Sequence, residues 1–295
     1  MLTSIGDVDV KLDRVSITGY LLIPFKDLED TLEEISTKWQ LQPDLKSDTK
    51  WWKLTRRISD DVYETVAVLM KNQYRNSWRV DTSNHFKTTE EKDLVIKVIN
   101  LLGNPHLTRI DIAFDYINCK YAGMRHKLYL PGTTSTTYTK YYGKGGQIET
   151  VNVGKRKSTR MFRYYNKLVE QEKAKHRMGP GCKSWERLEV QLRGQKSYEW
   201  IANAEKMLDC FKLPEINKLD KVNDRANLII MLEHPEIFKE FRKGKKGKYR
   251  KMYEENQGVN VEYAEVSKEV LKKKIDSIQK EINEFFAEMK IENQV

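Results

Sequence analysis

The sequence predicts an α+β fold, in which a mixed, largely antiparallel sheet is flanked by helices and followed by a helical C-terminal region. Three observations support this fold class. Segments that alternate apolar and polar residues recur through the first two thirds of the chain, and many are close enough to form hairpins. Helical segments lie between some strands only, which argues against a doubly wound parallel sheet. The last third shows helical periodicity.

The predicted elements follow from alternation and from turn residues. LTRIDIAFDY at residues 107–116 is the clearest strand, and WERLEVQLR at 185–193 alternates up to a turn at Gly194. Residues 148–153 and 160–167 flank the turn GKRKST and should form a hairpin. Short echoes among DRVSI, WRVD and TRIDI are compatible with a duplicated sheet. The other predicted strands are 10–24, 51–57, 62–70 and 78–81, and the predicted helices are 25–37, 89–102, 167–175, 197–211, those up to 241, and 262–292.

The charge distribution favours a polyanionic partner. The 295 residues carry a formal net charge of +10, and basic residues concentrate in the GKRKST hairpin and in KEFRKGKKGKYRK at 239–251. We interpret residues 239–251 as a loop. Its basic side chains would either contact DNA or remain solvated by water. The residues expected to contact phosphates are Arg156, Lys157, Arg160, Arg163, Lys243, Lys245, Lys246, Lys248 and Arg250.

Other features narrow the class of protein. No apolar run is long enough to cross a bilayer, and the first residues lack a signal-peptide pattern. We therefore expect a cytoplasmic protein with no membrane partner. The three cysteines match neither a disulfide framework nor a zinc site, and the five histidines show no metal-binding spacing.

Three carboxylates on separate predicted strands are candidate metal ligands: Asp111, Glu149 and Glu189. Glu189 is the strongest, because it lies among arginines on the polar face of its strand, where core packing does not explain it. Asp111 lies about 13 Å from Asp115 along the strand, so one ion is not expected to bind both. Carboxylate oxygens suit Mg²⁺ or Mn²⁺. The alternatives are an ion pair between Asp111 and Arg109, and solvation of Glu149 at a strand end.

A tyrosine just beyond the turn adds a candidate nucleophile. Tyr198 lies at the predicted start of a helix, where the helix dipole favours a phenolate. A metal and a basic neighbour would help it to attack a phosphodiester. Spacing alone favours a plainer role, in which Tyr198 packs against Trp200. Competing tyrosines lie in TTYTKYYGKGG at 136–146, a stretch suited to stacking on unpaired bases. The candidates for holding the phosphate are Arg163, Lys167, Arg187 and Arg193.

Three stretches together resemble the Rep_trans family, the replication initiators of staphylococcal-type rolling-circle plasmids. They are LTRIDIAFDY, ETVNVGKRKSTRMFRYYNKLVEQ and WERLEVQLRGQKSYEW, and they span roughly residues 107–200. The glycine–basic–serine turn followed by an arginine–tyrosine–lysine strand is the most specific part. Relaxases of conjugative elements share these motifs.

The resemblance implies a homodimeric, sequence-specific enzyme that nicks and rejoins DNA. Its tyrosine would attack one strand in a hairpin loop extruded from the double-stranded origin, leaving a 5′-phosphotyrosine. The free 3′-OH would prime a host DNA polymerase while a host helicase unwinds the duplex. Residues 1–212 would form the α+β nicking and closing domain, and residues 213–295 would form a helical, basic region that recognises DNA and is a candidate for dimerisation. Carried onto this chain, the resemblance places the catalytic tyrosine at Tyr198 and metal ligands at Glu189 and Asp111, with Glu149 as a further candidate. Arg187 and Lys167, chosen for their charge, complete the expected catalytic set.

Other functions remain open at this point. A conjugative relaxase would use the same chemistry, a regulator would bind DNA without cutting it, and a metal nuclease would use water as its nucleophile. No Gly-x-x-x-x-Gly-Lys-Ser/Thr motif is present, so helicase activity is not expected. The last predicted helix carries an apolar seam that suits either a partner helix or the protein's own body. Its residues are Leu271, Ile275, Ile278, Ile282, Phe285 and Met289.

Overall fold

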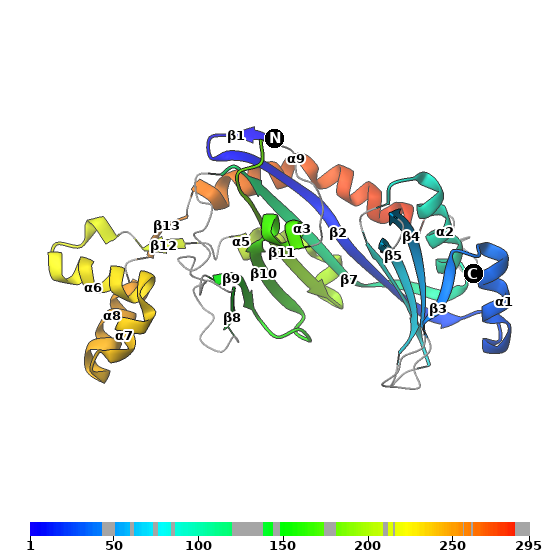
Figure 1. The fold of residues 1–295 in the computed structure, drawn as a ribbon, viewed down its shortest axis with the longest axis horizontal. Helices are drawn as coiled ribbons and strands as arrows, with labels where there is room; N and C mark the ends of the chain where they lie inside the picture. Colours follow the sequence, from blue (N-terminus) through cyan, green and yellow to red (C-terminus); the bar gives the residue numbers. More distant parts are fainter. Residues whose placement is uncertain are drawn as a thin grey trace. The chain divides into compact units, whose positions relative to one another are not determined.

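The structure is a computed structural model of the chain, drawn as a ribbon in Figure 1. It describes residues 1–42, 51–59, 62–72, 76–83, 86–119, 138–143, 148–173, 181–208, 212–214, 216–255, 257–260 and 262–286. The chain forms two compact units. Unit 1 comprises Met1–Val10, Ala113–Val190 and Ile201–Lys273, and unit 2 comprises Lys11–Ile112, Gln191–Trp200 and Lys274–Val295. Both units combine strands with helices, so the predicted α+β class is confirmed.

Unit 2 contains an antiparallel sheet and two helices that contact each other, α1 and α2 (Figure 1). Its strands neighbour one another in the order β3, β4, β5, β6, β2 and β7. β2 and β7 also contribute residues to unit 1. The elements are β2 (Gly6–Leu21), η1 (Phe25–Asp27), α1 (Leu28–Ile35), β3 (Trp39–Gln42), β4 (Trp51–Ser59), β5 (Val62–Lys71), β6 (Trp78–Ser83), α2 (Thr89–Ile99), β7 (Leu102–Ile117) and α4 (Gln195–Tyr198).

Apolar alternation sets the register of this sheet. Trp52 of β4 lies opposite Leu69 of β5, and Val80 of β6 pairs with Leu69 on one side and Ile17 of β2 on the other. All four side chains are buried. A shift by one residue would turn a strand's apolar row towards solvent, so burial specifies the pairing. The predicted antiparallel pair at 51–57 and 62–70 is thereby confirmed.

Unit 1 contains strands β11, β10, β9 and β8, which neighbour one another in that order. β9 and β10 form the predicted hairpin, with Tyr164 opposite Val151 and Tyr165 opposite Thr150. Because side chains alternate along a strand, Tyr164 and Tyr165 lie on opposite faces of the sheet. The elements are β1 (Leu2–Thr3), β8 (Tyr138–Tyr142), β9 (Ile148–Val153), β10 (Arg160–Asn166), α3 (Lys167–Lys173), β11 (Trp185–Arg193, which ends in unit 2) and α5 (Trp200–Leu208).

The core of unit 1 includes a set of paired aromatic residues beneath α9 (Glu262–Glu284). Tyr116 of β7 stacks on Tyr263 of α9 with ring centroids 4.1 Å apart, and its hydroxyl lies 2.8 Å from that of Ser267. The Tyr164 and Tyr263 hydroxyls are also 2.8 Å apart. Burial raises the pKa of Tyr116 and Tyr263 above the usual range, so both stay neutral. These tyrosines hold α9 on the sheet.

A helical group occupies much of the region after α5. Leu228 of α6, Phe238 of α7 and Tyr249 of α8 form a shared buried cluster. Asp224 of α6 accepts hydrogen bonds from Lys248 and Tyr249 of α8, each at 2.8 Å. The predicted loop at 239–251 is therefore wrong, because most of it forms α8. The elements are β12 (Lys212–Pro214), η3 (Ile216–Lys218), α6 (Val222–Glu233), α7 (Pro235–Glu240), α8 (Lys243–Glu255) and β13 (Gln257–Asn260), which pairs with β12.

The apolar seam of the last helix packs within the chain itself. The Phe285 ring lies 6.1 Å from that of Phe86, and both belong to unit 2. Ile275 is half-buried, and Met289 lies outside the described residues. This burial supports the second sequence-based alternative, packing onto the protein's own body. The buried members of the seam are Leu271, Ile278, Ile282 and Phe285.

Replacing the most deeply buried aromatic of the seam tests this packing. Phe285→Ala should lower the free energy of unfolding by about 3 to 4 kcal/mol, because it removes a buried ring and leaves a cavity. Urea denaturation monitors the loss, and Tyr63→Ala, at a side chain 61% exposed, is the control and should change little. An unchanged unfolding transition together with an altered sedimentation coefficient would instead assign the seam to a partner.

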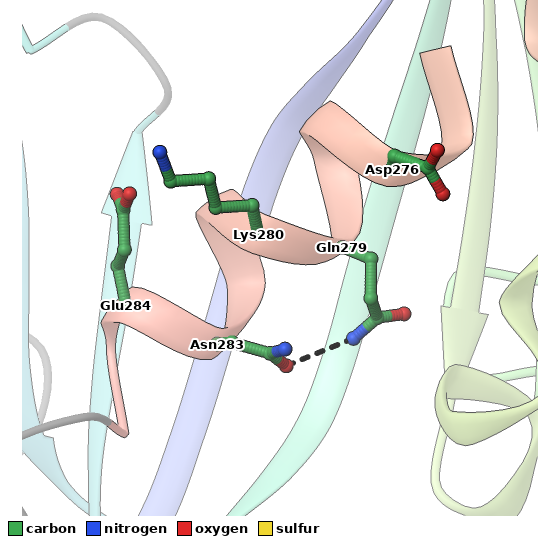
Figure 2. A pocket seen from close by; sticks show the side chains of 5 residues that line it. All are labelled: Asp276, Gln279, Lys280, Asn283 and Glu284. Carbon is green, nitrogen blue, oxygen red and sulfur yellow. Dashed lines mark hydrogen bonds between the residues drawn. The ribbon is translucent and has the colours of Figure 1, made fainter. Parts of the chain in front are cut away.

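A shallow hollow of about 340 Å³ lies along the second half of α9 and is lined by polar side chains (Figure 2). Gln279 donates a hydrogen bond to Asn283 (2.9 Å) and accepts one from the Trp200 indole (3.1 Å). No predicted site residue lines this hollow. Among the helices of the described residues, none is long and apolar enough to cross a membrane.

Candidate active site

Tyr165 is the centre of a charged cluster on one face of unit 1. Its hydroxyl donates a hydrogen bond of 2.6 Å to Glu189 of β11. The Arg163 guanidinium lies 4.2 Å from the centre of the Tyr165 ring and 3.5 Å from the Glu189 carboxylate. Strands β10 and β11 are neighbours in the sheet, so alternation brings these side chains onto one face. The phenol is thus hydrogen-bonded to the carboxylate, and the guanidinium lies at ion-pair distance from the same carboxylate.

The next helix adds a second cation and a second carboxylate. Lys167, the first residue of α3, is buried and lies 5.7 Å from the Tyr165 ring. Its ammonium group contacts the Glu170 carboxylate, which also lies 3.8 Å from Arg163. Glu170 is 38% exposed in its side chain and Arg163 39%. Glu170 therefore bridges two cations at the solvent-facing edge of the cluster.

The electrostatics of the cluster keep Tyr165 neutral at rest. Burial raises its pKa well above the usual tyrosine range, and the adjacent negative charge of Glu189 raises it further. The Arg187 guanidinium opposes this shift. A phenolate is therefore not stored in the free protein, and the proton has to leave as an attacking bond forms. Glu189, which already accepts that proton in a hydrogen bond, is positioned to take it.

Arg187 does not belong to the open part of the cluster. It is only 2% exposed, and Asp115 of β7 accepts from it at both carboxylate oxygens, at 2.6 and 2.8 Å. Asp115 also accepts from the Trp185 indole at 2.8 Å. The two-point ion pair with Asp115 argues against the prediction that Arg187 holds a phosphate, and it assigns both residues to the support of the sheet. Alternation placed Arg187 on the polar face, but only the fold shows that this part of the face is covered.

Tyr198 lies elsewhere in the fold, in unit 2. It is the last residue of the short helix α4, two residues before α5 begins, so the expected benefit of a helix N-terminus does not apply. The side chain is 56% exposed. Within the described residues its hydroxyl makes no hydrogen bond. The nearest ion pair in sequence joins Lys196 to Glu199 at 2.7 Å.

The structure does not bring the three predicted metal ligands together. Glu149 is bound by Lys173 at 2.8 Å, and it lies on the opposite face of β9 from Thr150, which is opposite Tyr165. Glu189 shares the face of Tyr165 instead. The part of the chain that the structure describes contains no group of three or more His, Cys, Asp or Glu side chains that could hold a metal ion. These carboxylates do not fit the predicted metal site.

Asp111 belongs to unit 2 and is paired there with an arginine. Arg109 donates to it with two nitrogens, one of them at 2.8 Å. Burial raises the pKa of Asp111, and the hydrogen bond from Arg109 opposes that rise. The ion pair foreseen as the alternative is present. The pair lies on an inner strand of the sheet, because β7 has β2 on one side and β11 on the other.

The basic residues predicted to bind DNA lie in two surfaces of unit 1. One is the β9–β10 turn and the strand that follows it, and the other is α8. On α8, Lys248 is paired with Asp224, and Lys245 lies 3.9 Å from the Phe241 ring centre. Lys246 donates to the Lys239 carbonyl. The exposed residues are Arg156, Lys157, Lys243, Lys245, Lys248 and Arg250, and the half-buried ones are Arg160, Arg163 and Lys246.

The sequence contained a signal for Tyr165 that was not used when Tyr198 was chosen from its position after the turn. Arg163, Tyr165 and Lys167 are spaced two residues apart in the predicted strand 160–167, and alternation alone would put them on one face. The same alternation put Glu189 on the polar face of its own strand. The pairing of β10 with β11 could not be predicted from the sequence, and this pairing puts Tyr165 and Glu189 on the same face of the sheet. The pairing of Asp115 with Arg187 was likewise not predicted from the sequence.

The chain is similar in sequence to curated proteins named replication initiation protein from Staphylococcus aureus. One is 28% identical over 218 residues, which cover 71% of this chain and 64% of that protein. Another is 24% identical over 293 residues, which cover 95% of this chain and 85% of that protein. The chain thus spans less than two thirds of the length of the first of these relatives.

Comparison with protein-family models and with solved structures completes this picture. No family model matches the chain. A rolling circle replication initiator protein from Geobacillus stearothermophilus aligns with a TM-score of 0.45 at 12% identity, covering 74% of this chain and 91% of that chain. By sequence, then, the chain is similar to replication initiation proteins along most of its length.

Proposed function

We propose that this protein initiates rolling-circle replication of a plasmid by nicking and rejoining DNA through a tyrosine. The observation that carries the chemistry is the hydrogen bond from Tyr165 to Glu189 beside Arg163. A nucleophile, a proton acceptor and a cation are the groups that transfer of a phosphodiester to a side chain requires. The similarity to proteins named replication initiation protein supports the biological setting.

The geometry favours Tyr165 over Tyr198 as the nucleophile. A weakly acidic phenol needs a base within reach and cations that hold the phosphate. Tyr165 has Glu189 at 2.6 Å, with Arg163 and Lys167 beside its ring. Tyr198 is exposed to solvent, and within the described residues no base or cation contacts its hydroxyl. The exact tyrosine in our proposal therefore differs from the one that the sequence resemblance implied.

Tyr165 is only 2% exposed in the free protein, so a neighbouring side chain has to move before DNA can reach it. We propose that Glu170 is this side chain. Its carboxylate bridges Arg163 and Lys167, the two cations nearest the tyrosine ring. A phosphodiester carries the same charge and could accept hydrogen bonds from both cations in its place. We therefore assign Glu170 as a stand-in for the phosphate in the free protein. Binding of DNA would exchange one anion for another and uncover the hydroxyl.

The proposed step moves one proton and exchanges one bond. The Tyr165 oxygen attacks the phosphorus and its proton passes to Glu189, while the bond from phosphorus to the 3′ oxygen breaks. The leaving oxygen takes a proton from solvent and becomes the 3′-OH, and the 5′ phosphate stays on the tyrosine. A later attack by a 3′-OH on this phosphotyrosine rejoins a strand without an external energy source, because the phosphodiester energy is conserved.

No step is assigned to a metal ion, because the predicted ligands do not form one site in the described residues. Dependence on Mg²⁺ or Mn²⁺ is kept as a proposal that the nicking assay tests directly. Dimer formation and the use of a host helicase and DNA polymerase are likewise proposals. Action on plasmid DNA would place the protein in the cytoplasm.

The basic face of α8 is our proposed surface for recognition of duplex origin DNA. Changing Lys243 and Arg250 together to alanine should weaken binding to origin duplex, because two cations that can meet phosphates are lost. The slope of log K against log salt should fall by up to about 1.8 in magnitude. Filter binding at several salt concentrations measures it. Lys272→Ala, at an exposed lysine of α9 in the same unit, is the control, and an equal effect there would argue against α8.

One experiment separates the proposed function from its alternatives. Supercoiled plasmid carrying the origin is incubated with the protein, with Mg²⁺ or Mn²⁺ or with EDTA. We expect a nicked circle with protein bound covalently at its 5′ end. Nicking without an adduct would indicate a nuclease that uses water, and binding without nicking would indicate a regulator. A relaxase would nick a transfer origin rather than a replication origin.

A further inference from the structure

Unit 2 carries a second charged cluster, on β6, β7 and β11, that the proposed nicking site does not use. Arg79 pairs with Asp81 at 2.9 Å, and Arg109 pairs with Asp111. Arg193 of β11 is the third arginine of this cluster, and Arg109 and Arg79 both repel it. Burial and this repulsion lower the pKa of Arg193.

The cluster has one positive charge more than it has negative charges. Three guanidinium groups face the two carboxylates Asp81 and Asp111. Asp13 and Arg14, which also act on Asp111, cancel one another. A half-buried surplus cation among other cations is unfavourable in the free protein. An anion at Arg193 would relieve this repulsion.

Two buried donors on β11 have no acceptor. The Nε atom of Arg193 and the Nε2 atom of Gln191 are buried and make no hydrogen bond within the described residues. The two residues are two positions apart on β11, so their side chains leave the same face about 6.6 Å apart. Buried donors without partners are uncommon in folded proteins and each costs free energy. Two on one face indicate a missing acceptor between them.

The orientation of the Gln191 amide is set by its neighbours. Its Oε1 atom accepts from Arg109 at 2.7 Å, and Arg109 is itself held by Asp111. With the oxygen committed to Arg109, the NH₂ group has to point elsewhere. The ion pair thus keeps a donor available on β11 beside Arg193, before any ligand is present.

We propose that Gln191 and Arg193 form a phosphate-binding site that holds a phosphodiester group of a DNA strand on unit 2. This inference rests on the proposed function, which supplies DNA as the ligand. A phosphate offers oxygen acceptors for both donors and a negative charge for the surplus guanidinium. The site uses none of the residues of the Tyr165 cluster, and it would position DNA without taking part in the chemistry.

Binding to a short oligothymidylate tests the proposal without any nicking. Arg193→Gln should weaken binding about tenfold, because a charged hydrogen bond is lost, and should lower the salt slope by about 0.7. Arg57→Gln removes the same charge from an exposed position of β4 in the same unit and is the matched control. It should change the affinity by less than about twofold. Thermal unfolding confirms that both variants are folded.

Two further measurements distinguish a specific phosphate-binding site at Arg193 from a general attraction between DNA and a positively charged surface. Arg193→Lys keeps the charge but loses the Nε–H donor, so it should not restore full affinity. In the NMR spectrum of the unmodified protein, the Arg193 Nε–H signal should shift on addition of inorganic phosphate and of the oligonucleotide. Equal affinities for Arg193→Gln and Arg57→Gln, full binding by Arg193→Lys, or an unmoved signal would each overturn the site and leave only ordered water at these donors.

These experiments distinguish failure of the proposed phosphate site from failure of the proposed nicking function. A protein that binds phosphate at Arg193 but never forms a covalent adduct would refute nicking and leave this site intact. A protein that forms the adduct while Arg193→Gln binds normally would refute this site alone.

Discussion

Tyr165→Phe should abolish the covalent protein–DNA adduct and reduce nicking by more than about a thousandfold, as loss of a nucleophile does in other enzymes. The substitution removes one oxygen that attacks phosphorus and leaves the ring between Arg163 and Lys167 in place. DNA binding should therefore persist at nearly unchanged affinity. Denaturing electrophoresis of labelled DNA after incubation with the protein measures the adduct, and filter binding measures the affinity.

Tyr198→Phe is the matched control for this experiment. It removes the same atom from an exposed tyrosine of unit 2, and the adduct should form as in the unchanged protein. If Tyr198→Phe loses the adduct while Tyr165→Phe keeps it, our assignment is wrong and the residue implied by the sequence resemblance is the nucleophile. If both variants keep it, the tyrosines of β8, Tyr138, Tyr141 and Tyr142, are the next to test.

Asp115→Ala should lower the free energy of unfolding by about 3 to 5 kcal/mol, because it leaves the Arg187 guanidinium buried without its counter-ion. Side-chain exposure is 2% for Arg187 and 4% for Asp115, so water cannot replace the lost carboxylate without a rearrangement. The Trp185 indole loses its acceptor in the same variant. Urea denaturation followed by tryptophan fluorescence measures the change.

Two control variants test whether the loss of stability in Asp115→Ala comes from leaving the buried Arg187 without its counter-ion. Asp7→Ala breaks an exposed ion pair with the N-terminal amine and should cost less than about 1 kcal/mol. Combining Asp115→Leu with Arg187→Met removes both charges and should recover much of the stability lost in Asp115→Ala. A loss below about 1 kcal/mol for Asp115→Ala would contradict a buried pair and would reopen the role of Arg187 as a phosphate ligand.

The strands were predictable because burial leaves a local trace in their sequences. The alternation in LTRIDIAFDY and WERLEVQLR marks β7 and β11, and the turn GKRKST marks the β9–β10 hairpin. The sequence of α8, in contrast, did not predict the structure that it forms. The glycines Gly244 and Gly247 lower intrinsic helix preference, and the lysines provide no apolar periodicity, so the segment was interpreted as a loop. Its helical state depends on Tyr249 and on contacts with α6, which are not local.

The candidate site was predictable in its parts but not in its assembly. Glu189 was identified from its place among arginines, and Arg163 and Lys167 from their charge. Their meeting with Tyr165 depends on strand pairing, which no spacing along the chain specifies. For the same reason, the three predicted carboxylate ligands do not form one group within the described residues. Each carboxylate was placed on a strand, but the register that puts Glu149 on the other face from Tyr165 is a property of the hairpin.

The sequence by itself determined the α+β class, most strands, the basic character of the chain and the residue types from which a phosphate site could be built. These follow from periodicity and composition, which act within a few residues. Only the tertiary structure decided that Glu189 meets Tyr165, that Arg187 is held by Asp115, and that Gln191 and Arg193 bury donors without acceptors. Pairing, burial and the choice of partner depend on residues far apart in the chain, so they arise only when the sheet forms.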